Sequence, residues 1–255
     1  MGPLAAILAA VALAAPSPPV LDQAIEEAHS RYEYAVAQGA RTLPSPDGRT
    51  FFVLWLPKNA TSVIVTLHGS SSYAYDEFFL WHPSAKRRGH GILAMQWWLG
   101  TGPDDYLTPK QVYALVSPIL RRNGFKKGRV LFHGFSRGSA NTYAVTFLDR
   151  SSGNRFFGMT IANSGSWEDD YAPNRAIAQK GAAALTGTRW FLWCGRLDPQ
   201  PMTGCPAMRR TREKIRRHGG EVLQLLEDPS GDHGGFHRNG ANIERALDVF
   251  ASVVR

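Results

Sequence analysis

Cysteine is scarce in this sequence, which has only Cys194 and Cys205 among 255 residues. Two thiols are too few for a structural zinc site of the cysteine-rich kind, and we expect no metal site. In an exported protein the two cysteines would lie where disulfides persist, and pairing them would close a short loop. Two separate buried thiols are the alternative. We favour the disulfide.

Long apolar runs are also missing, since no stretch reaches the roughly 20 residues that a membrane-spanning helix needs. The apolar run over residues 1–15 is short, carries Ala12 and Ala14 in an A-x-A pattern and leads into prolines, as secretory signals do. It lacks the usual basic residue at its start, and the alternative is an N-terminal helix of the domain. We predict a signal peptide over 1–15, a single domain over 16–255, secretion, and no stable membrane insertion.

Acidic residues are outnumbered, 21 against 29 Lys and Arg, which gives a net charge of +8. Much of the excess lies in residues 208–220, where aromatic side chains are few. Nucleic-acid sites combine basic and aromatic groups, so this segment is better interpreted as a solvated helix face. We expect no nucleic-acid partner, and we expect a monomer.

The chain alternates strand-like and helix-like segments and contains no internal repeat. A helical pattern over residues 21–39 is followed by two strands joined at the Pro-Asp-Gly turn of residues 46–48. Strands then alternate with helices up to a last helix near residue 242. Such alternation predicts a three-layer α/β/α sandwich whose mostly parallel sheet begins with antiparallel N-terminal strands.

Ser136 stands in the motif G-x-S-x-G, within "VLFHGFSRGSA". The residues before it are typical of a strand and those after it of a helix, which is the setting of a nucleophile elbow. Glycine at 134 and 138 fits a strained turn whose neighbours leave no room for side chains. We predict that Ser136 is a nucleophile.

A serine nucleophile needs a base and an acid that holds the base, and both candidates lie downstream. Asp198 follows the strand-like "RWFLWCG", and His233 lies in the glycine-rich "DPSGDHGGFH" before the last helix. Reactive groups collect at the carboxyl ends of parallel strands, where all three residues are expected. The order Ser136, Asp198, His233 indicates a catalytic triad.

Other acids and bases remain in the same segments. His237, four residues after His233, could be the base, and the pair could ligate a metal, although no third ligand has suitable spacing. The rival acids are Asp169, Asp170 and Asp232.

The oxyanion formed on an ester carbonyl needs two backbone N–H donors. The N–H of Arg137 is one candidate, and the loop "HGSSSY" offers Ser70 or Ser71 as the other. We interpret His68, in the same loop, as structural. The Arg137 side chain is free either to enter the site or to form a surface ion pair.

Aromatic residues cluster in the loops expected around this site. Trp97, Trp98, Tyr73 and Trp167 are candidates for stacking on a substrate, with Tyr75 nearby, although each could equally be packed beneath the loops. Only about 23 residues separate "IANSG" from "TRWFLWCG", too few for a large lid.

The motifs "LHGSSS", "HGFSRGS", "CGRLDP" and "SGDHGGF", in this order, resemble the α/β-hydrolase superfamily. Within it the chain is similar to compact secreted carboxylesterases of the polyhydroxybutyrate depolymerase, feruloyl esterase and acetylxylan esterase groups. The resemblance implies an α/β-hydrolase fold without a large lid and a serine esterase that needs no cofactor. Its substrate would be a polymer-linked, aromatic or short-chain ester. A serine peptidase and a non-catalytic polysaccharide-binding or cell-wall-binding protein are the alternatives.

Overall fold

The computed structural model describes residues 17–254 and contains a single eight-stranded sheet with the order β1-β2-β4-β3-β5-β6-β7-β8. The first two strands are antiparallel to their neighbours, and all other pairs are parallel. The strands are β1 Arg41–Pro44, β2 Phe51–Trp55, β3 Val63–Leu67, β4 Gly91–Met95, β5 Val130–Phe135, β6 Phe157–Asn163, β7 Arg189–Gly195 and β8 Glu221–Asp228. This confirms the predicted sheet. The predicted signal peptide lies outside the described residues.

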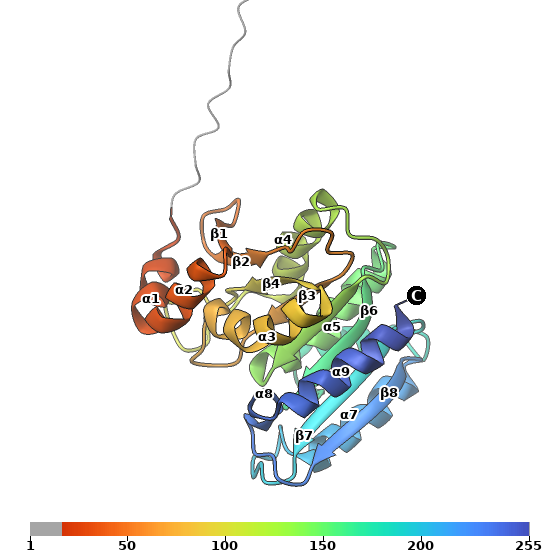
Figure 1. Cartoon of the computed structure of the whole chain (residues 1–255). Helices are drawn as coiled ribbons and strands as arrows, with labels where there is room; N and C mark the ends of the chain where they lie inside the picture. The colour runs from red at the N-terminus through yellow and green to blue at the C-terminus, as the bar shows by residue number, and fades with distance from the viewer. Residues whose placement is uncertain (1–16, 255) are drawn as a thin grey trace, which may run out of the picture.

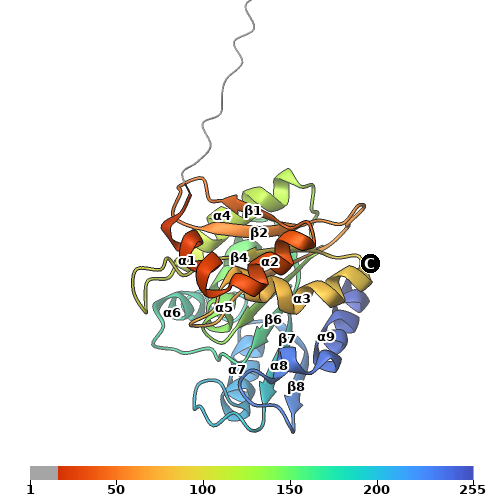
Figure 2. The ribbon, with the colours of Figure 1, turned by 60° about the vertical axis from the view of Figure 1, so that its left-hand side comes forward.

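Helices cover both faces of the sheet, as Figures 1 and 2 show. One apolar core joins the sheet to α1, α2, α3, α8 and α9, and two others join it to the helices α4, α5, α6 and α7 of the opposite face. The helices are α1 Pro19–Glu27, α2 His29–Ala37, α3 Ala74–Arg88, α4 Pro109–Arg122, α5 Arg137–Ser151, α6 Ala172–Ala178, α7 Cys205–Arg217, α8 Gly235–Arg238 and α9 Gly240–Val253. The predicted three-layer α/β/α sandwich is therefore present.

The central strands are buried on both faces, as expected for parallel strands between two helical layers. Every residue of β3 and β4 is buried, and so are five of the six residues of β5. With both faces covered, a side chain can reach solvent mainly from the loops at the strand ends. Chemistry on this fold is consequently concentrated in those loops.

The N-terminal half differs from the sequence-based prediction in two places. The single helix expected over residues 21–39 is two helices, because the chain leaves helical geometry at Ala28 (φ −107°, ψ 33°). Helix α3 was not predicted; it contains Pro83, a residue that normally argues against a helix interior. Its start is fixed by reciprocal bonds between Tyr73 and Asp76, and it ends at Gly89 in the left-handed region.

The connection from β6 to β7 carries only the seven-residue helix α6, in agreement with the expected lack of a large lid. No helix among residues 17–254 is long and apolar enough to cross a membrane.

Candidate active site

Ser136 lies on the sharp turn between β5 and α5. Its backbone has φ 52° and ψ −115°, a strained conformation for a residue with a side chain, and its N–H donates to the Asn163 carbonyl at 2.9 Å. A Cβ on Gly134 would clash with the backbone of Gly138, and a Cβ on Gly138 would lie 2.5 Å from the carbonyl oxygen of Leu67. Both glycines of the motif are therefore required by close backbone approach.

His233 is brought to Ser136 by the loop between β8 and α8. Its Nε2 lies 2.9 Å from Ser136 Oγ, and its Nδ1 lies 2.8 Å from Asp198 Oδ2. The hydrogen bond to the carboxylate places the proton on Nδ1, so Nε2 presents a lone pair to the serine hydroxyl. The structure thus brings together the three residues that the sequence singled out.

Asp198 is held by its own loop, which follows β7. Thr203 Oγ1 donates to Oδ2 at 2.7 Å and the N–H of Gln200 donates to Oδ1 at 3.1 Å. Its side chain is fully buried, whereas that of His233 is 28% exposed. The acid is therefore fixed and shielded from water, while the imidazole edge remains accessible to a substrate.

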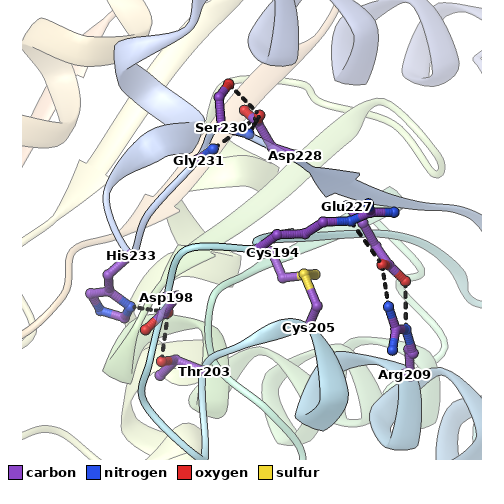
Figure 3. The surroundings of a disulfide bond; sticks show 11 residues. Cys194, Asp198, Thr203, Cys205, Arg209, Glu227, Asp228, Ser230, Gly231 and His233 are labelled. Carbon is purple, nitrogen blue, oxygen red and sulfur yellow. Dashed lines mark hydrogen bonds and ion pairs between the residues drawn. A yellow bond between two sulfur atoms is a disulfide. The ribbon is translucent and has the colours of Figure 1, made fainter.

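A disulfide closes the loop that carries Asp198. Cys194 at the end of β7 is bonded to Cys205 at the start of α7, which confirms the predicted pairing. Figure 3 shows Asp198 and Thr203 on the segment between the two cysteines, with His233 facing the carboxylate. The crosslink therefore limits the freedom of the loop that positions the acid.

The predicted oxyanion donors belong to the segment that follows Ser136 and to the loop that follows β3. Arg137 begins α5 and Ser70 follows β3, and within residues 17–254 no backbone carbonyl accepts from either N–H. Gly69 lets the loop after β3 approach the end of β5, because a Cβ at this position would lie 2.9 Å from the Phe135 ring. Ser71, the alternative to Ser70, has φ 53°. Free N–H groups beside a nucleophile suit a developing negative charge.

His68 is a buried structural residue, in line with the expectation. Its Nδ1–H donates to the carbonyl of Gly69 at 2.7 Å, and Nε2 faces the N–H of Trp97 at 3.4 Å. Burial lowers the pKa of His68, which keeps the imidazole neutral.

Two of the rival acids form ion pairs away from Ser136, and the rival base lies beside Glu77 with no hydrogen bond to its ring among residues 17–254. His237 is nearly buried and faces Glu77, with 4.0 Å between Nε2 and Oε2. Asp169 pairs with Lys214 at 2.9 Å, and Asp232 pairs with Arg238.

A buried polar cluster lies behind the nucleophile. Glu77 Oε2 accepts from Thr66 Oγ1 at 2.5 Å and lies 3.4 Å from His133 Nδ1. Burial alone would raise the pKa of Glu77, but the hydrogen bond and charge of His133 outweigh it and hold the pKa at about 2. Among the described residues, Glu77, His133 and His237 form the group able to ligate a metal, with donor atoms within 4.8 Å of one another. The sequence showed only the H-x-x-x-H pair and not this grouping.

Two cavities adjoin the site, of about 440 and 370 Å³. Arg137, Asp104 and Tyr106 line both, and the smaller one is also lined by Ser70 and Ser71. Ser136 and His233 line neither cavity, but both cavities share Arg137, the residue that follows Ser136.

The predicted aromatic contacts are divided between cavity walls and core. Trp97 lines the larger cavity, and Trp98 and Tyr73 line the smaller one. Trp167 does not fit the expected substrate contact: it is 2% exposed, packs against Tyr143 and His218, and lines neither cavity. Tyr75 is also buried in the core.

Several cavity residues carried no motif and were not predicted. Glu27, on α1, lines the smaller cavity and accepts from the Tyr73 hydroxyl at 2.7 Å. Burial raises the pKa of Tyr73, and the hydrogen bond and charge of Glu27 raise it further. Asn141 and Tyr171, which were not predicted either, line the larger cavity. An acidic residue so far from the motifs in sequence gave no signal.

No family model and no curated protein matches this sequence. Solved structures do match in fold. The chain is similar to the hyperthermophilic esterase of the archaeon Pyrobaculum calidifontis, with TM-score 0.60 and 11% identity over 93% of this chain and 98% of that one. It is also similar to an esterase of Rhizomucor miehei, with TM-score 0.63 and 11% identity over 91% of this chain and 89% of that one. A carboxylesterase of Mesorhizobium loti matches with TM-score 0.61 and 17% identity over 81% of this chain and 98% of that one. Identities this low establish the fold alone: the protein has the α/β-hydrolase fold.

Proposed function

We propose that the protein is a serine hydrolase that cleaves carboxylic esters through an acyl-enzyme. The observation that carries the proposal is the hydrogen-bonded chain from Ser136 Oγ to His233 Nε2, at 2.9 Å, and from His233 Nδ1 to Asp198 Oδ2, at 2.8 Å. Nucleophile, base and acid within hydrogen-bond reach are the geometry that acyl transfer needs. The esterases of the same fold support this choice of reaction.

In the first half of the reaction, Ser136 Oγ attacks the ester carbonyl while His233 Nε2 takes its proton. The carboxylate of Asp198 stabilises the imidazolium that forms, and its bonds from Thr203 and Gln200 keep it in place. The N–H groups of Arg137 and Ser70 would bind the oxyanion. His233 then gives its proton to the leaving alcohol.

In the second half, a water molecule replaces the alcohol. His233 takes a proton from this water, the hydroxide attacks the acyl carbonyl, and the acid is released as Ser136 regains its proton. Proton transfer and oxyanion stabilisation account for every step, so the scheme calls for no metal or cofactor.

Polymer-linked, aromatic or short-chain esters are the substrates that we propose. Trp97 and Tyr106 line the larger cavity and Trp98 lines the smaller one, which favours flat or compact groups on the substrate. We also propose that the protein is secreted and monomeric. The disulfide is compatible with export.

Labelling with a fluorophosphonate probe tests the activated serine. We expect the wild-type protein to be labelled and to hydrolyse p-nitrophenyl acetate, and Ser136→Ala to lose both. Ser151→Ala, at the exposed end of the same helix, is the matched control and should keep both. Absence of labelling would favour the non-catalytic binding protein. Labelling together with cleavage of peptides but not esters would favour the peptidase.

A further inference from the structure

The Arg137 side chain has a place in the site that the proposed reaction does not use. Its guanidinium lies at the junction of the two cavities and stacks over the Tyr106 ring, 4.5 Å from the ring centre. Nη1 donates to the carbonyl of Pro103 at 3.2 Å. These contacts orient the planar guanidinium of the residue that follows the nucleophile in sequence and leave some of its N–H groups available for another acceptor.

The guanidinium of Arg137 is paired with a weakly held carboxylate. Arg137 Nη2 lies 2.7 Å from Asp104 Oδ1, and the Asp104 side chain is 82% exposed. An exposed ion pair contributes little net free energy, so a second carboxylate entering the cavity can replace Asp104. Asp104 therefore indicates the chemistry that the guanidinium selects.

A second polar group of the larger cavity has an unused donor. Asn141 is 2% exposed and lines this cavity, and its Oδ1 accepts from the Tyr171 hydroxyl at 3.1 Å. Among residues 17–254 the amide N–H groups of Asn141 have no hydrogen-bond partner. The amide nitrogen has almost no accessible surface, so it meets a bound acceptor oxygen only after the side chain turns toward the cavity. A buried donor without a partner is unfavourable, which favours that turn when an acceptor is present.

The other groups lining the larger cavity are mostly apolar or aromatic, among them Trp97, Leu107 and Ala140. Of the described residues that line this cavity, Arg137 is the one cation and Asp104 the one anion. The cavity thus combines an apolar surface with a fixed cation and a free amide donor. This combination fits an organic molecule that carries a carboxylate.

We propose that the larger cavity binds esters bearing a carboxylate, which Arg137 and Asn141 hold in place of Asp104. The inference rests on the proposed esterase function and narrows its substrate class to anionic esters. Because Arg137 follows Ser136 directly, the bound carboxylate would lie roughly 6–10 Å from the reacting carbonyl. A spacer of intermediate length should therefore be preferred.

The kinetic test compares p-nitrophenyl half-esters of dicarboxylic acids, from succinate to suberate, with neutral p-nitrophenyl esters of equal chain length. A second pair, acetate esters of phenol and of 4-hydroxyphenylpropionate, places the carboxylate on the alcohol side. We expect the anionic substrate of the best length to exceed its neutral match about tenfold in kcat/KM, in one of the two series. A preference that peaks with length separates a fixed site from attraction by the overall positive charge.

Variants are judged by the ratio of kcat/KM for anionic and neutral esters, which cancels a general loss of activity. Arg137→Gln and Asn141→Leu should lower this ratio, and Asp104→Asn should raise it. Arg121→Gln removes one charge from the exposed face of α4 and should leave the ratio unchanged. An equal fall in Arg121→Gln and Arg137→Gln would overturn the inference, and so would a ratio near one for the wild type in both series.

A binding measurement keeps the inference separate from the reaction. Isothermal titration calorimetry on Ser136→Ala should show monomethyl adipate binding about tenfold more tightly than methyl hexanoate, with the difference removed by Arg137→Gln. If neutral esters are hydrolysed but neither assay shows a preference for the anion, only this inference is wrong. If no ester is hydrolysed, the proposed function fails, and the calorimetry still decides whether the carboxylate site exists.

Discussion

Removing the disulfide should weaken both the fold and the proposed active site, because the bond closes the loop that carries Asp198. The double change Cys194→Ala/Cys205→Ala avoids leaving two buried thiols. The cysteines are 11 positions apart, and the loop-closure entropy for a ring of this size corresponds to about 3 kcal/mol. We expect the free energy of unfolding to fall by about this amount, because the unfolded chain gains freedom.

The same variant should lose turnover for a local reason. Thr203 and Gln200, which bond Asp198, lie inside the closed loop, so their alignment relaxes when the bond is gone. A displacement of about 1 Å in a catalytic group can lower kcat by roughly a hundredfold, and we expect a fall between ten- and a hundredfold.

Urea unfolding followed by tryptophan fluorescence gives the free energy, and p-nitrophenyl acetate hydrolysis gives kcat, each with and without dithiothreitol. The reductant should destabilise the wild type and leave the double variant unchanged. A stability loss below about 1 kcal/mol, or full activity in the double variant, would refute the reasoning that the crosslink holds the acid.

Three further changes test other parts of the site. Asp198→Asn should lower kcat by about 10⁴ with little change in melting temperature, since it disturbs the tautomer of the base rather than the packing. Gly138→Ala places a Cβ 2.5 Å from the Leu67 carbonyl oxygen and should destabilise the protein by about 1–3 kcal/mol in urea; an unchanged midpoint would contradict the close approach. Burial raises the pKa of Glu77, but His133 lowers it to about 2, which is below the value in the unfolded chain. The ionised Glu77 therefore contributes fully to the free energy of unfolding above about pH 4.5, and this contribution is lost as the pH falls toward 2. We expect a loss of about 2 kcal/mol between pH 6 and pH 3 in the wild type, and a clearly smaller one in Glu77→Gln.

The sequence predicted the sheet and the catalytic candidates because both depend on local signals. Strand-like runs end just before Ser136 and Asp198, and His233 lies between glycines, so each residue falls in a loop after a strand. Parallel strands bring those loops to one edge. The lack of a large insertion between β6 and β7 was also predictable, because few residues separate these two strand-like segments in the sequence.

The cavity walls could not be predicted, because they depend on contacts between distant segments. Glu27 reaches the smaller cavity from α1 through its bond to Tyr73, 46 positions away. Trp167 and Trp97 both follow strands and look alike in sequence, yet only Trp97 lines a cavity. Helix α3 was not predicted, and its interior Pro83 is a residue that is unfavourable in helices.

The close packing of glycines around Ser136 also divides the nucleophile region into positions that can and cannot be varied. A Cβ on Gly134, Gly138 or Gly165 would collide with backbone, which cannot move aside as a flexible side chain can. Arg137 and Ala140, in contrast, line a cavity. A mutant library aimed at new substrates should therefore keep the three glycines and randomise Arg137 and Ala140, because these two residues line a cavity and are not among the close backbone contacts of the turn.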